Sequence, residues 1–194
     1  MEPDTDDLLE LTDPRQMRAL AHPLRLRLLG MLRMDGPATA TTLADEVDES
    51  PALVSYHLRQ LASHGFIHEA ADLARDGRER WWRASHRGTT WSHASFMASP
   101  EHASAATLLM SEIAERYADA ARVWLADSAN WSREWIEVSD MSDWLLELNP
   151  AQAHRMHDEL VSVIERYVAE PAGEGAERVR TIVHVLPNRA RPHR

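Results

Sequence analysis

Helix starts and stops recur at close intervals in the first third of this 194-residue chain, and they limit the folds it can adopt. Asp13-Pro14 and Ser50-Pro51 each place a proline directly after a side chain that caps helices. Another helix begins at His22-Pro23, Thr39 is a further cap, and Gly65 supplies a C-terminal stop. The sequence therefore predicts four consecutive short helices.

The pattern changes after the fourth helix. Residues 66–70 are short and strand-like, and a polar stretch containing Asp76-Gly77 separates them from a second strand near 78–83. This predicts a hairpin with a long tip, which carries a local excess of arginine. Four helices followed by a basic hairpin are the layout of a winged helix-turn-helix.

Two motifs within this layout carry a family resemblance. His-Pro-x-Arg begins at His22, and Val-Ser-x-His-Leu-x-x-Leu begins at Val54 and is followed by Gly-Phe-Ile at Gly65. Together they resemble the ArsR-type winged-helix transcriptional regulators over about residues 13–90, most closely the longer actinobacterial members with an extra C-terminal half. The resemblance implies a DNA-binding protein that dimerises.

A DNA-reading helix buries one face and leaves the other open to the major groove. Val54, Leu58 and Leu61 form the expected buried stripe of the helix over about 50–64. Arginine and glutamine read base edges, whereas serine and tyrosine contact phosphates or bases. An ordinary amphipathic helix with a solvated face is the alternative. The candidate DNA contacts on this helix are Ser50, Ala52, Ser55, Tyr56, Arg59 and Gln60.

The hairpin, about residues 66–87 and called the wing below, is expected to lie over the minor groove or the backbone, where charge contacts dominate. Its candidate contacts are Arg75, Arg78 and Arg80. Thr39 and Thr41 begin the third helix and are candidates for a phosphate, although capping explains Thr39 equally well. A solvated hairpin is the alternative for the wing, and His57 is expected to be packed.

The net charge of −10 is unevenly distributed. Residues 14–90 carry 11 arginines against 9 acids, whereas residues 91–194 carry 10 arginines against 16 acids. Local charge decides how a surface meets a polyanion, so the acidic total does not exclude DNA.

A long helix opens at Pro100-Glu101 in the second half. Its apolar residues follow at spacings of 4, 3, 4, 3 and 4, the pattern of a helix–helix seam. The resemblance implies dimerisation here, and packing within one chain is the alternative. The candidate dimer residues are Ala106, Met110, Ile113, Tyr117, Ala120 and Trp124.

The remainder predicts a strand near 143–148, a helix over about 150–169 and a strand over 179–186. The inward residues of that helix are expected to be Met156, Leu160, Val163, Ile164 and Tyr167. The expected fold class is α+β and mostly helical. A loose acidic lead (1–12) precedes the winged helix-turn-helix (13–90), and the dimerisation helix and strand-helix-strand appendage (91–194) follow as a candidate effector-sensing region.

Ligand sites are weakly indicated. Tryptophans of the second half are candidates for an apolar effector pocket, although core packing is more usual: Trp91, Trp124, Trp131, Trp135 and Trp144. His154 and His157 have metal-ligand spacing, but a solvated helix is favoured. Cysteine is absent, and neither a metal nor a cofactor is expected. No membrane span or signal peptide is apparent, so the protein is expected to be cytoplasmic.

The sequence thus predicts a homodimeric, sequence-specific transcriptional regulator whose partners are double-stranded DNA and a second copy. One alternative is a winged-helix protein-interaction module that does not bind DNA, which the acidic total fits. An enzyme lacks support, because the chain has no glycine-rich phosphate loop, His-Glu-x-x-His motif or Gly-x-Ser-x-Gly motif.

Overall fold

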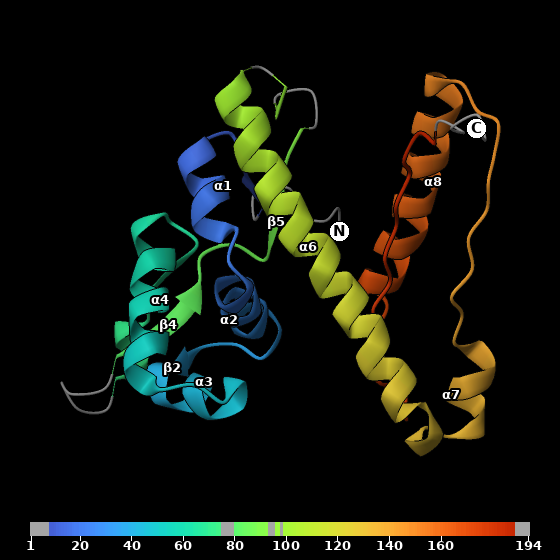
Figure 1. Cartoon of the computed structure of the whole chain (residues 1–194). Coiled ribbons are helices and arrows are strands. Elements are labelled where there is room, and N and C mark those ends of the chain that lie inside the picture. Colours follow the sequence, from blue (N-terminus) through green and yellow to red (C-terminus); the bar gives the residue numbers. More distant parts are fainter. Residues whose placement is uncertain (1–7, 75–79, 93–95, 98, 189–194) are drawn as a thin grey trace. The chain divides into compact units, whose positions relative to one another are not determined.

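The structure is a computed structural model that describes residues 8–74, 80–92, 96–97 and 99–188 (Figure 1). The chain divides into two compact units, which are described separately. The N-terminal unit runs to Ala126, and the C-terminal unit begins at Asp127. None of the helices described is both long and apolar enough to cross a membrane.

The N-terminal unit has the expected order of helices followed by a hairpin. Its helices are α1 (Pro14–Leu20), α2 (Pro23–Met34), α3 (Ala40–Val47), α4 (Pro51–Ser63) and α6 (Pro100–Asp127, whose last residue belongs to the next unit). Its strands are β1 (Leu8–Glu10), β2 (Ala38–Thr39), β3 (Ile67–Glu69), β4 (Trp81–Ala84) and β5 (Gly88–Thr90). The antiparallel sheet has the order β2-β4-β3, with Ile67 opposite Ala84 and Ala38 opposite Trp82.

Side-chain caps explain where the four short helices begin. Asp13 accepts a hydrogen bond of 2.8 Å from the Arg15 amide, and Ser50 accepts one of 3.3 Å from the Leu53 amide. The predicted starts at Pro14 and Pro51 are therefore confirmed. His22 also caps a helix, since its Nδ1 accepts a hydrogen bond from the backbone N–H at the second residue of α2.

The turn between α3 and α4 bends at Asp48. Its φ of 56° and ψ of 48° are left-handed, and it is the one non-glycine residue with positive φ among those the structure describes. Aspartate tolerates this conformation better than most residues because its short polar side chain bonds locally. This left-handed turn sets the angle at which α4 leaves α3.

One core joins the helices to the hairpin and to α6. Its fully buried members include Leu28, Leu29, Leu58, Leu61 and Phe66. Ala105, Ala106 and Leu109 of α6 are buried in the same core. Farther along α6, the Arg116 guanidinium passes over Gly30 and donates to the Leu26 carbonyl of α2. The first half of α6 is therefore an integral part of the N-terminal unit.

The expectation of a loose lead is wrong for the described residues before Asp13. Leu8–Glu10 form β1, which pairs in parallel with β5, and Leu11 is completely buried. The reason is that leucines among the acids reach the core, and the Leu11 amide donates to the Thr90 carbonyl at 2.9 Å. Residues 1–7 lie outside the described residues.

The C-terminal unit contains α7 (Arg133–Val138) and α8 (Pro150–Ala169). Asn149 and Gln152 form a reciprocal capping box at the start of α8, which confirms the helix predicted there. The two strands predicted near 143–148 and over 179–186 are wrong, because neither segment forms a ladder with any described residue. A strand pattern produces a strand only where a partner backbone is present.

Burial in this unit also differs from the prediction. Leu160, Val163 and Tyr167 were expected to face inward but are 41%, 40% and 70% exposed. The described residues of the unit leave these three side chains at its surface. The fold class itself is confirmed as a mostly helical α+β protein with an N-terminal helix-turn-helix. Among the described residues, all strands lie in the N-terminal unit.

Candidate nucleic-acid interface

Helix α4 has the two faces expected of a DNA-reading helix. Val54, Leu58 and Leu61 are completely buried on one side. Tyr56 is 50% exposed on the other, and Arg59 is exposed there as well. The remaining candidates on this helix are exposed (Ser50, Ala52) or partly exposed (Ser55, Gln60). The buried face positions the helix against its own unit, and the polar face remains accessible.

The side chain of Arg59 lies along the surface of α4. Its Nε donates to the Ser55 carbonyl one turn earlier, at 3.2 Å. This contact orients the guanidinium, whose planar fork suits bidentate recognition of a base edge.

The two threonines at the start of α3 differ in their surroundings. Thr39 is only 4% exposed, and its Oγ1 accepts from the Thr42 amide at 3.2 Å. It also bonds the Thr42 hydroxyl at 3.0 Å. The structure thus favours the capping alternative for Thr39. Thr41 is exposed and remains a candidate for a phosphate contact.

The wing contains β3 and β4, and two of its described arginines pair with acids. Arg80 pairs with Glu69 at 3.1 Å, and its guanidinium carbon lies 5.8 Å from the centre of a Trp82 ring. Arg83 pairs with Asp72 at 3.1 Å. Pairs this exposed contribute little to stability, so Arg80 can exchange its partner for a phosphate at small cost. Arg75 and Arg78 lie outside the described residues.

Two contacts that position the helix-turn-helix were missed by the sequence analysis. Gln16 of α1 donates from Nε2 to the His64 carbonyl at 3.0 Å and so caps the end of α4. Arg27 of α2 donates to the Glu46 carbonyl at 2.7 Å near the end of α3. The partners lie 48 and 19 residues apart, so local sequence patterns contain no signal for either contact.

A histidine pair lies behind the recognition face. His57 of α4 is only 5% exposed, as expected for a packed histidine, and its ring centre is 4.5 Å from that of His22. Burial lowers the pKa of both imidazoles, and nearby Arg25 lowers them further. Each histidine is therefore favoured in its neutral form.

This pair predicts that acid weakens the N-terminal unit. A histidine whose pKa is lower in the folded chain stabilises the fold above its ordinary pKa of about 6.5, and the stabilisation is lost as the pH falls. Protonation of His22 at Nδ1 also removes the acceptor that caps α2. Urea unfolding is expected to give a smaller free energy at pH 5.5 than at pH 7.5.

The control for this prediction is His22→Asn, which keeps a capping acceptor and does not titrate. It is expected to show a weaker dependence on pH than the wild type. An identical dependence in both proteins would mean that His22 does not contribute.

The seam predicted along α6 is divided by the structure. Ala106 is buried in the core of its own unit, and Met110 and Ile113 pack against that core. For these three residues the structure favours the alternative of packing within one chain. Tyr117, Ala120 and Trp124 lie farther along α6 and are partly exposed. Of the six seam residues only Ala106 is buried, and the other five keep part of their surface accessible.

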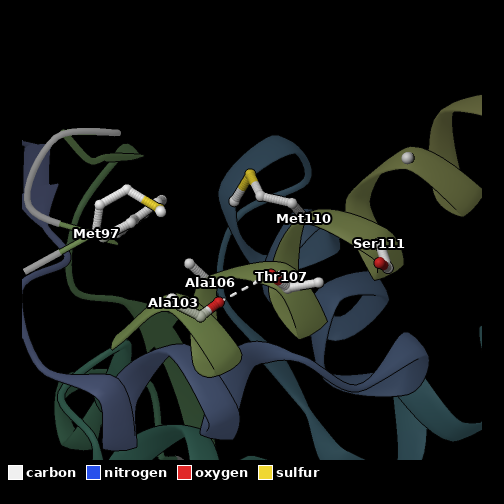
Figure 2. A pocket seen from close by; sticks show the side chains of 8 residues that line it. Met97, Ala103, Ala106, Thr107, Met110 and Ser111 are labelled. Carbon is white, nitrogen blue, oxygen red and sulfur yellow. Dashed lines mark hydrogen bonds between the residues drawn. The ribbon is translucent and has the colours of Figure 1, made fainter. Parts of the chain in front are cut away.

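An apolar groove of about 500 Å³ lies beside the first half of α6 (Figure 2). Met97 and Met110 lie at its border, and Ala103 and Thr107 form its floor, joined by a hydrogen bond of 2.8 Å. No tryptophan is among its lining residues. The expected tryptophan-lined pocket is thus not this groove.

The histidines with metal-ligand spacing lie on the surface of α8. His154 and His157 lie 3.5 and 3.4 Å from Asp158, and both are exposed. Within the described part of the chain, no group of three or more histidines and acids has a geometry that could hold a metal ion. The arrangement supports the solvated-helix interpretation.

A comparison with protein-family models matches part of the N-terminal unit. Residues 20–70, which contain α2, α3 and α4, match a family model described as a helix-turn-helix domain. Residues 20–70 are a helix-turn-helix domain. Helix-turn-helix domains commonly place their second helix in the major groove of DNA.

Two solved structures are similar at low identity. The apo form of a Lactococcus lactis ZitR mutant has 15% identity and a TM-score of 0.33, and the match covers 76% of this chain and 83% of that chain. The adhesin competence repressor AdcR of Streptococcus pyogenes has 14% identity and a TM-score of 0.33, covering 76% and 81%. No curated protein matches the chain.

Proposed function

We propose that the protein is a homodimeric, ArsR-like winged-helix transcriptional regulator that binds specific sequences in double-stranded DNA. One observation carries this proposal. Helix α4 is the last helix of the matched helix-turn-helix domain, and it buries its apolar side while exposing Tyr56 and Arg59 on the other. A helix presented in this way fits the major groove.

Roles are proposed for the candidate side chains from their chemistry. Arg59 and Gln60 read base edges, and Tyr56 contacts a base or a phosphate. Ser50 and Ser55 contact the backbone, and the small side chain of Ala52 lets α4 approach the base edges closely. These contacts give the protein its sequence preference.

The phosphate contacts are proposed to come from the wing and from α3. Arg80 turns from Glu69 toward the backbone, and Arg75 and Arg78, which precede it in the sequence, act with it. Thr41 presents its hydroxyl near the N-terminus of α3. Such contacts orient the protein and supply affinity that does not depend on sequence.

A single winged helix reads one half-site, and its affinity is limited by the small surface that it buries on DNA. Two copies on one operator add their contacts, which explains why helix-turn-helix readers are commonly dimeric. We therefore include a homodimer in the proposal. A winged helix that binds protein instead of DNA is the competing function, and the ion pairs that partly neutralise the wing favour it.

The wing provides the test of this proposal. Alanine at both Arg78 and Arg80 is expected to lower affinity for all duplexes alike, because phosphate contacts carry charge but no sequence information. The slope of log K against log salt is expected to fall by about 2, which corresponds to two lost phosphate contacts. Fluorescence anisotropy with a labelled duplex at several salt concentrations measures both quantities.

The matched control is Arg133→Ala, which removes an equally charged side chain from the surface of the C-terminal unit. It is expected to leave the affinity and slope unchanged. A wing variant whose affinity and slope both equal those of the wild type would place the wing off the DNA. A loss confined to the preferred sequence would show that the wing reads bases.

A further inference from the structure

The C-terminal unit exposes an unusual amount of apolar surface. None of its described residues is buried, although a chain of about 60 residues normally buries about 60% of its surface on folding. Trp144 is 76% exposed, Leu145 81% and Leu186 72%. The described residues of the unit form no buried core among themselves, which leaves this apolar surface open to a partner.

The size of the exposed surface fits a protein partner. Fourteen large apolar residues of this unit are at least 40% exposed. At about 150 Å² for each such side chain, their exposed area is on the order of 1,000 Å². A stable interface buries about 800 Å² on each partner. This area is spread over residues 136–186, and in sum it is of the size that a stable dimer needs.

The sequence of α8 indicates which partner fits. Ala153, Met156, Leu160, Ile164 and Tyr167 follow one another at spacings of 3, 4, 4 and 3, which is a palindrome centred on Leu160. All five lie on one face of the helix, because these spacings return to the same side every turn. Each is partly or largely exposed.

A palindromic stripe is complementary to a second copy of itself. When two identical helices pack antiparallel across a two-fold axis at Leu160, residues equally far from Leu160 on either side meet. Met156 then meets Ile164, and the small Ala153 meets the large Tyr167. Leu160 meets Leu160 at the centre. The stripe is therefore compatible with a two-fold interface between two copies of this chain.

We propose that the C-terminal unit is the dimerisation surface, with α8 packed antiparallel on α8 of a second copy of this chain. The inference rests in part on the proposed function, since a reader of two half-sites needs two copies. The proposed interface differs from the one predicted along α6. Ala106, Met110 and Ile113 of that seam pack against the core of their own unit.

The first test measures the mass of the full chain without DNA, so that its outcome is independent of DNA binding. The wild type is expected to sediment at twice the chain mass of 22.0 kDa. Leu160→Glu places two carboxylates against each other at the axis and is expected to sediment as one chain. Ser162→Glu adds the same charge to the opposite face of α8 and is expected to remain dimeric.

The second test uses the absence of cysteine from the sequence. Leu160→Cys introduces one thiol at the axis, where the two copies bring their thiols together and copper-phenanthroline oxidises them to a disulfide. Ser162→Cys carries its thiol on the far face. A covalent dimer is expected on a non-reducing gel for the first variant and not for the second.

Three outcomes would overturn the proposal. They are a wild type that sediments as a single chain, a Leu160→Glu variant that stays dimeric, and equal crosslinking of the two cysteine variants. The crosslinking comparison keeps the test decisive even where glutamate at Leu160 unfolds α8, because the cysteine adds no charge.

Discussion

Leu58→Ala is expected to destabilise the N-terminal unit by about 2–5 kcal/mol, the range measured for truncating large buried aliphatic side chains. Leu58 is completely buried in the middle of α4. Removing it takes apolar area out of the core and leaves a cavity between α4 and the helices behind it. Urea unfolding followed by circular dichroism measures the loss.

The chain provides a matched control on the same helix. Leu53 is 38% exposed, so Leu53→Ala removes the same atoms from a position that buries little area. Its cost is expected to stay below about 1 kcal/mol. Similar losses for the two variants would mean that the faces of α4 are assigned incorrectly and that the polar face is not the one presented to DNA.

Arg59→Ala is expected to weaken binding to the preferred operator by about 1–3 kcal/mol, or roughly 5- to 150-fold. The reason is that an exposed guanidinium on the groove-facing side of α4 is lost. The fold is expected to survive, because the side chain is exposed and bonds the carbonyl of Ser55 within its own helix. Anisotropy titration with an operator selected from random duplexes measures the change.

Arg59→Lys separates charge from base recognition. Lysine keeps the positive charge but lacks the planar fork of arginine, so it is expected to retain non-specific affinity and lose discrimination at one base pair. Unchanged operator affinity in a folded Arg59→Ala protein would rule out a base contact at this position.

The starts of the short helices could be predicted because the signal is local. A cap and the proline after it lie within two residues, and Asp13, Thr39 and Ser50 all cap as expected. The two faces of α4 were also predictable, because helical periodicity alone places Val54 and Leu58 together. His57 was correctly expected to be packed.

Other features depend on contacts between distant residues. The capping of α4 by Gln16 and the pairing of Leu8–Glu10 with Gly88–Thr90 join segments that no local pattern connects. The α6 seam was ambiguous because heptad spacing is the same for a core helix and a dimer helix. The structure answers this for Ala106 alone, which is buried in the core of its own unit.

The prediction of two C-terminal strands was wrong for a third reason. The segment over 179–186 is rich in β-branched residues and so has the composition of a strand, but the chain offers it no pairing partner among the described residues. Residues such as Val179 and Leu186, 69% and 72% exposed, are therefore left uncovered. The apolar residues of this segment therefore indicate a surface that would cover them, although they do not form the predicted strand.

The central claim is that this acidic protein binds duplex DNA through its N-terminal unit. Anisotropy of a labelled mixed-sequence duplex of about 30 base pairs tests it directly, with salt raised from about 50 to 200 mM. Binding is expected despite the net charge of −10, with log K falling linearly with log salt. Absence of binding at the lowest salt, or an affinity that does not depend on salt, would contradict the claim.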